Sequence, residues 1–64
     1  MKINTYKIEI LLGKQDMTKT ALGEKAGICR QNISTILKRG TCEPRTVAKL
    51  ASGLGVDINE IIEN

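Results

Sequence analysis

The sequence predicts a single all-α domain of five short helices that spans residues 1–64. Three observations lead to this prediction. Apolar residues recur at spacings of three and four, the spacing of one helix face. TVAKLASGLGV also has this spacing and not the period of two that marks a strand. Four glycines stand where the apolar stripes stop, Gly13, Gly27, Gly40 and Gly55, and the one proline, Pro44, stands where a stripe begins. A chain of 64 residues, 41% of them hydrophobic, provides one small core.

The first two helices are marked by their capping residues. Asn4 is expected to cap a first helix that runs to about Gly13, because its side chain can accept a hydrogen bond from an open amide of the first turn. Thr18 is expected to cap the second helix in the same way. Gly27 ends that helix, with the positive φ that glycine adopts more easily than other residues.

The third helix is expected to begin after Cys29, a poor N-cap because a thiol is a weak acceptor, and to end at Gly40. Helical spacing divides its residues into two faces. The inner face is apolar and consists of Ile28, Ile33, Ile36 and Leu37. The outer face carries hydrogen-bonding side chains, namely Cys29, Arg30, Gln31, Ser34, Thr35 and Lys38. A helix with this outer face, preceded by a glycine turn and a supporting helix, can enter a major groove and contact base edges.

Two further helices complete the predicted domain. Pro44 suits the first position of a fourth helix that runs to about Gly55. Asp57 and Glu60 have the spacing of a reciprocal capping box, which predicts a short fifth helix. The apolar residues of this last helix are more than one face can bury: Ile58, Ile61 and Ile62. We therefore expect them both to complete the core and to contact a second subunit.

Basic residues are concentrated in the middle of the chain. Between Lys19 and Lys49 the sequence holds seven basic and two acidic residues, whereas residues 50–64 hold three acidic residues and no basic one. A charged run is most often only a solvated surface, but here the positive part coincides with the second and third helices. A polyanionic partner is therefore favoured.

The composition argues against several other classes of protein. The sequence contains no histidine, and Cys29 and Cys42 alone cannot form a four-ligand zinc site. It shows no paired-carboxylate cleft and no phosphate-cradling glycine loop, so we expect neither an enzyme nor a bound cofactor. Tyr6 is the only aromatic residue, which argues against single strands held by stacking. With no signal peptide or membrane-length apolar run, the expected compartment is a reducing cytoplasm in which both cysteines are thiols.

Three segments carry a resemblance to a known family. MTKTALGEKAGI resembles the supporting helix and turn, RQNISTIL the recognition helix, and KLASGLGVDINEII the closing helices of Cro and phage-repressor-type (XRE-like) helix-turn-helix proteins. The resemblance runs from about Ile8 to Ile62. It implies the five-helix lambda-repressor-like fold, a bacterial, phage or mobile-element origin, and binding to double-stranded DNA. The chain differs from the family at Gly23, where alanine is usual, at Cys29, where serine is usual, and at Lys19, where many members have a phosphate-contacting glutamine.

The resemblance also implies roles for individual residues. Arg30 and Gln31, in the first turn of the recognition helix, are expected to contact guanine and adenine, and Thr35 a thymine methyl group or a phosphate. Thr18 and Lys19 lie where the amides and dipole of the supporting helix attract phosphate. The complete set expected to contact the DNA backbone is Thr18, Lys19, Ser34, Lys38, Arg39, Thr41 and Arg45.

These expectations combine into two hypotheses of different class. The first is a sequence-specific, double-stranded DNA-binding transcriptional regulator, a repressor that reads the major groove with the helix around residues 29–39. A single small domain covers little DNA, so a homodimer on two half-sites is expected, formed through the C-terminal helix. The second is a protein-interaction module on the same fold, such as an antitoxin-like or anti-repressor partner whose basic face meets an acidic protein. Arg30, Gln31 and Lys19 on the expected outer surface favour DNA.

Overall fold

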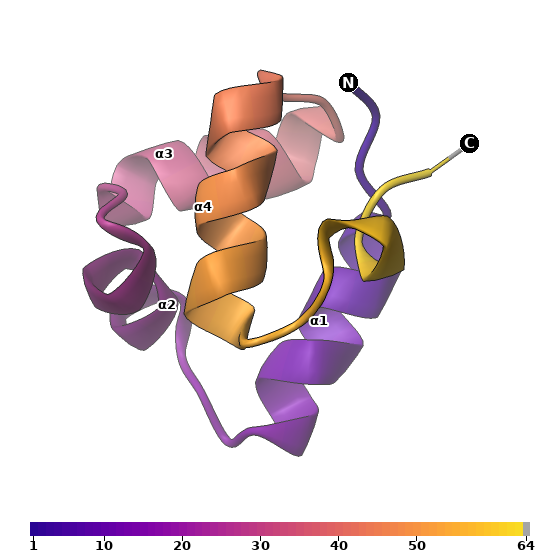
Figure 1. Cartoon of the computed structure of the whole chain (residues 1–64). Coiled ribbons are helices and arrows are strands. Elements are labelled where there is room, and N and C mark those ends of the chain that lie inside the picture. The colour runs from indigo at the N-terminus through magenta and orange to yellow at the C-terminus, as the bar shows by residue number, and fades with distance from the viewer. Residues whose placement is uncertain (64) are drawn as a thin grey trace.

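The computed structural model describes residues 1–63, which fold into four α-helices and one 3₁₀ turn (Figure 1). The elements are α1 (Thr5–Lys14), α2 (Lys19–Ala26), α3 (Arg30–Arg39), α4 (Pro44–Leu54) and the turn η1 (Ile58–Glu60). In Figure 1 α4 stands in front, with α2 to its left, α1 below and to its right, and α3 passing behind its upper part. The all-α prediction is confirmed, and the only strand-like pairing within residues 1–63 is two isolated bridges.

The helix ends follow the local signals that predicted them. The Asn4 side chain accepts a hydrogen bond from the Lys7 amide at 3.0 Å, and the Thr18 side chain accepts one from the Ala21 amide at 3.1 Å. These bonds satisfy amides that have no partner within their own helix. Three helices end at a glycine in the left-handed region, with φ between 71° and 76°: Gly27, Gly40 and Gly55.

The prediction of a fifth α-helix was wrong, because residues 58–60 form only a single 3₁₀ turn. The predicted capping box is present: the Asn59 amide donates to Asp57, and the Asp57 amide donates to Glu60. The chain leaves the helical path at Ile61, and the next residue pairs with the N-terminal segment instead. A capping box can start a turn, but three residues are too few to extend it into a stable α-helix.

The core gathers side chains from all four helices and from both ends of the chain. The largest fully buried side chains are Ile8, Leu22, Ile33, Val47, Leu50, Leu54 and Ile61. Burial of each contributes about 1.5–3 kcal/mol to folding. Ile61 is 0% exposed and therefore belongs to the core alone, whereas Ile58 and Ile62 stay partly exposed.

The N-terminal segment joins two parts of the chain that are distant in sequence. The Ile3 amide donates to the Gly40 carbonyl oxygen at 3.0 Å, and the Asn4 amide donates to the Ile61 carbonyl oxygen at 2.8 Å. Residues 1–4 therefore lie between the α3–α4 loop and the residues that follow η1 (Figure 1). The position of this loop depends on the segment that supports it.

Candidate nucleic-acid interface

α2 and α3 form a helix-turn-helix unit with a tight turn. Gly27 reverses the chain with a φ of 71°, and the Ile28 amide donates to the Gly23 carbonyl oxygen at 2.9 Å. A Cβ atom on Gly23 would lie 2.5 Å from the Ile28 carbonyl oxygen, so the turn packs against α2 more closely than a side chain there permits. α3 then begins at Arg30, and its N-cap Cys29 makes no side-chain capping bond, as predicted.

α3 presents one long polar face to solvent. Ile33 is the only buried residue of this helix. Every residue predicted for the outer face is exposed: Cys29, Arg30, Gln31, Ser34, Thr35 and Lys38. The helix carries three basic side chains and no acidic one. Such a face suits a polyanion and offers hydrogen-bonding groups of several lengths to base edges. The contacts of these residues with DNA remain predictions.

The Thr35 hydroxyl is already engaged within α3. It donates to the Gln31 carbonyl oxygen at 2.9 Å, a bond to the residue four positions earlier. This bond uses the single hydroxyl hydrogen, so Thr35 keeps a methyl group and an acceptor oxygen for an external partner. That chemistry fits the predicted contact with a thymine methyl group better than donation to a phosphate.

The N-terminus of α2 is the second region predicted to contact DNA. Thr18, Lys19 and Thr20 are all exposed. The Thr18 oxygen caps the Ala21 amide, while the first two amides of a helix have no partner four residues earlier within it. Such amides, together with the positive end of the helix dipole, attract phosphate. The Lys19 side chain adds a full positive charge at the same place.

The third group of predicted contacts surrounds the loop between α3 and α4: Arg39 ends α3, Thr41 lies in the loop, and Arg45 lies in the first turn of α4. Arg39, Thr41 and Arg45 are exposed. Gly40 sets the start of the loop with a φ of 76°, and the Cys42 amide donates to the N-terminal segment at 3.0 Å. Burial raises the pKa of the Cys42 thiol above its ordinary value. The loop is therefore fixed by backbone bonds, and the exposed basic side chains of Arg39 and Arg45 lie on the helix ends at either side of it.

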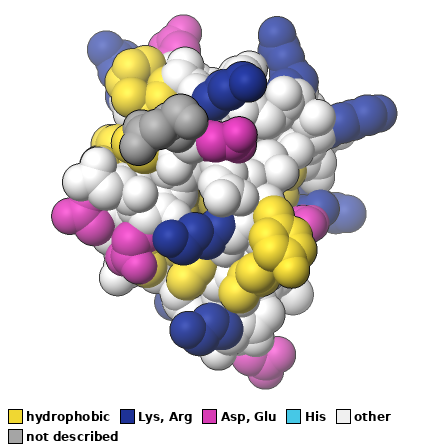
Figure 2. Space-filling model, turned by 90° about the vertical axis from the view of Figure 1, so that its right-hand side faces the viewer, with side chains coloured by type: hydrophobic (Ala, Val, Ile, Leu, Met, Phe, Trp, Pro, Cys, Tyr) yellow, Lys and Arg dark blue, Asp and Glu magenta, His cyan; other side chains and the backbone are white. Residues whose placement is uncertain are grey.

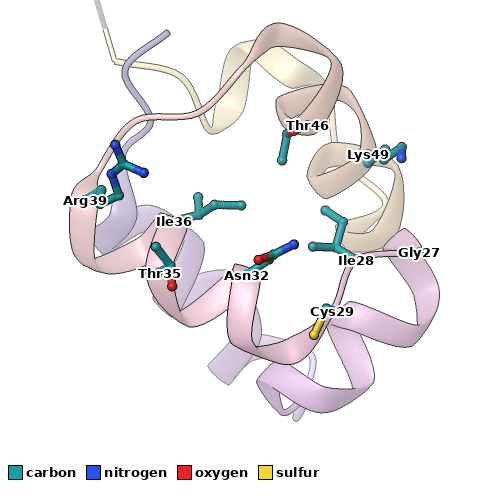
Figure 3. Close-up of a pocket in the computed structure, with 9 residues that line it drawn as sticks. All are labelled: Gly27, Ile28, Cys29, Asn32, Thr35, Ile36, Arg39, Thr46 and Lys49. Atoms are coloured by element: carbon teal, nitrogen blue, oxygen red, sulfur yellow. The ribbon is translucent and has the colours of Figure 1, made fainter.

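One part of this surface was not predicted from the sequence, a groove between α3 and α4 (Figure 3). Asn32 on α3 lines it together with Thr46 and Lys49 on α4. Asn32 is exposed, one turn after Ile28 and two turns before Arg39, on the flank of α3 that faces α4. That spacing could have identified Asn32 as a residue of the flank of α3 that faces α4. No local pattern connects Thr46 or Lys49 with α3.

The face formed by α1 and the chain ends has a different character. Figure 2 shows basic and acidic side chains interspersed there, with separate hydrophobic patches. The large hydrophobic residues that are exposed are Met1, Tyr6 and Ile10. A surface of mixed charge has no preference for a polyanion. The α3 side is therefore the candidate nucleic-acid interface.

A comparison with protein families agrees with this geometry. The model of the Cro/C1-type HTH DNA-binding domain matches residues 7–64. The chain belongs to this family. Membership makes α2 and α3 the helix-turn-helix unit of a Cro/C1-type DNA-binding domain, as the three sequence segments implied. No curated protein and no solved structure gave a significant match. None of the described helices is long and apolar enough to cross a membrane.

Proposed function

We propose that this Cro/C1-type domain is a sequence-specific, double-stranded DNA-binding regulator that represses transcription by occupying an operator. The observation that carries the proposal is the outer face of α3, which is exposed, rich in hydrogen-bonding groups and free of acidic side chains. A helix of this kind, on a glycine turn after a supporting helix, fits the major groove. A protein-interaction module would instead be expected to show an acidic or apolar outer face.

Base recognition and backbone contact are assigned to different residues. Arg30 can donate two hydrogen bonds to a guanine edge, and Gln31 can pair with both polar groups of an adenine edge. Thr35 offers its methyl group to thymine. Phosphate contacts position the domain and carry no sequence information. They are assigned to the N-terminus of α2, the later turns of α3, the α3–α4 loop and the first turn of α4: Thr18, Lys19, Ser34, Lys38, Arg39, Thr41 and Arg45.

We further propose a homodimer on two half-sites, since one small domain covers too little DNA for useful specificity. Ile58 and Ile62 supply partly exposed apolar surface after α4. Ile62→Glu places a charge on this surface and is expected to shift sedimentation toward monomer while weakening binding to a full site. Loss of the fold in this variant, seen by circular dichroism, would instead place Ile62 in the core.

Selection of bound sites from random duplex DNA is the decisive experiment, followed by titration of variants. Gln31→Ala is expected to cost about 1–3 kcal/mol on the preferred site and to relax preference at one position per half-site, with little change in non-specific affinity. Lys19→Ala should weaken all duplexes alike and reduce the salt slope by about one per subunit. If folded Arg30→Ala and Gln31→Ala proteins both select the original consensus, α3 is not the reading helix, and an interaction module becomes the better account.

Repression is tested separately from binding. A reporter whose promoter overlaps the selected site should lose expression when the protein is present, because an occupied operator excludes polymerase. The Gln31→Ala variant should restore expression in proportion to its loss of affinity. Increased expression with the unaltered protein would identify an activator and contradict the repressor assignment.

A further inference from the structure

The groove between α3 and α4 has a definite chemical character. It is apolar on its floor, polar on its walls and basic at its two ends, with Ile28, Ile36, Asn32, Thr46, Arg39 and Lys49 among its lining. The two isoleucines are partly buried and pack against the core. Figure 3 shows Asn32 and Thr46 directed into the space from opposite helices, with Arg39 and Lys49 at opposite ends.

The charges of the groove select the kind of molecule that can occupy it. Arg39 and Lys49 are both exposed, and no acidic side chain of the described residues lines the groove. Two basic ends without an acidic partner attract an anion. The groove is a partly open depression and not an enclosed cavity, so it suits a chain that passes across it better than an enclosed small molecule.

The groove is continuous with the predicted reading face. Asn32 and Thr35 line both the groove and the neighbouring hollow formed with Arg30, Gln31 and Ser34. A strand that passes beside the base-contacting residues therefore enters the groove. The ten residues of α3 span about 15 Å, close to the rise of four nucleotides of one strand at about 3.4 Å each.

We infer that this groove holds the sugar–phosphate backbone of one strand of the duplex. Lys49 and Arg39 neutralise phosphates, and Asn32 and Thr46 donate hydrogen bonds to phosphate oxygens. The inference rests on the proposed function, because the occupant is the same DNA that α3 reads. It gives a DNA-contacting role to a lysine in the middle of α4. α3 is then held on both flanks, by the N-terminus of α2 and by α4.

Lys49→Ala tests the inference, and Lys7→Ala is the matched control because it removes the same charge from an exposed position on α1. Both proteins are titrated with the selected site and with an unrelated duplex over a range of salt concentrations. Lys49→Ala should reduce the salt slope by about 0.9 per subunit and weaken both duplexes by the same factor, with the selected consensus unchanged. Lys49→Arg should retain the slope, since it keeps the charge. Lys7→Ala should match the unaltered protein.

The outcomes separate this inference from the proposed function. If the unaltered protein binds DNA but Lys49→Ala and Lys7→Ala give the same slope, the inference is overturned and the proposed function stands. If no duplex is bound, both are overturned. A polyglutamate peptide whose binding is lost in Lys49→Ala, while the DNA slope is unaffected, would assign the groove to an acidic protein segment. Because Lys49 is exposed, Lys49→Ala should melt at the temperature of the unaltered protein. If Lys49→Ala does not fold, Lys49→Gln is used in the same titrations.

Discussion

Gly23→Ala separates helix propensity from packing at the helix-turn-helix turn. In an unhindered helix interior, alanine is favoured over glycine by about 1 kcal/mol. At this position, however, a Cβ atom would lie 2.5 Å from the Ile28 carbonyl oxygen and 3.3 Å from the Ile33 side chain. The nearer atom belongs to the backbone, and the Ile28 amide already donates to the Gly23 oxygen at 2.9 Å. The turn must therefore move away from α2 before a methyl group can fit.

The size of the effect follows from the two opposing contributions. Overpacking costs about 1–3 kcal/mol, and a backbone obstacle belongs near the upper end because it cannot rotate aside. After the propensity gain of about 1 kcal/mol is subtracted, we expect a net loss of about 1–2 kcal/mol. In a domain of this size each kcal/mol shifts the melting temperature by roughly 4–8 °C. The midpoint should therefore fall by about 4–16 °C.

Thermal and urea unfolding, followed by far-UV circular dichroism, measure this change. Gly13→Ala is the matched control, because nothing lies within 4 Å of a Cβ atom there, and it should raise stability by about 0.5–1 kcal/mol. Gly53→Ala is an intermediate case, with a Cβ atom 3.0 Å from that of Ala26. If Gly23→Ala melts at or above the original temperature while Gly13→Ala behaves as expected, the close approach of the turn to α2 is refuted.

Two further predictions concern the turn glycine and the cysteines. Gly27→Val puts a β-branched residue at a φ of 71° and should lower the free energy of unfolding, measured by thermal unfolding, by about 1–2 kcal/mol. Gly27→Asn should lower it less, because asparagine adopts a positive φ more easily. Equal melting temperatures for the two variants would show that the turn had relaxed. Cys29 is exposed, whereas burial raises the pKa of the Cys42 thiol, so Cys29 should be alkylated first. The rate at Cys42 should keep rising to a higher pH than that of a free thiol, and mass spectrometry that finds Cys42 modified first would contradict the structure.

The helix boundaries could be predicted because each depends on residues within about one turn. Asn4 and Thr18 accept bonds from amides three residues later, and Gly27 ends α2 through its own backbone conformation. These interactions need no contact with a distant part of the chain. A sequence read one segment at a time therefore contains the information that places them.

The residues after α4 were predicted less well because their structure depends on a distant segment. The capping box of Asp57 and Glu60 is local and was predicted. The path beyond it is set by the N-terminal segment, where the Asn4 amide donates to the Ile61 carbonyl oxygen at 2.8 Å. Helical periodicity continued the apolar pattern into an α-helix and had no means of including this pairing.

The candidate site divides in the same way. The exposed face of α3 follows from helical periodicity, and its predicted side chains are exposed as expected. The groove between α3 and α4 depends on the crossing of two helices, which is decided by core packing. The sequence therefore shows Lys49 only as one of several basic residues. The fold places it in the same groove as Asn32.

The N-terminal segment supports two surfaces that the proposed function assigns to different partners. The Ile3 amide donates to Gly40 on the α3–α4 loop, and Ile3 also pairs with Ile62 in an antiparallel bridge. Reduced DNA affinity in Ile62→Glu therefore has two sources, loss of the dimer and displacement of the loop that carries Thr41. Ile58 is partly exposed on η1, outside both bridges, so Ile58→Glu adds the charge without disturbing Ile3. If this variant becomes monomeric and loses full-site affinity but keeps half-site affinity, loss of the dimer accounts for the reduced DNA binding. If it stays dimeric, the apolar surface after α4 is not the subunit contact.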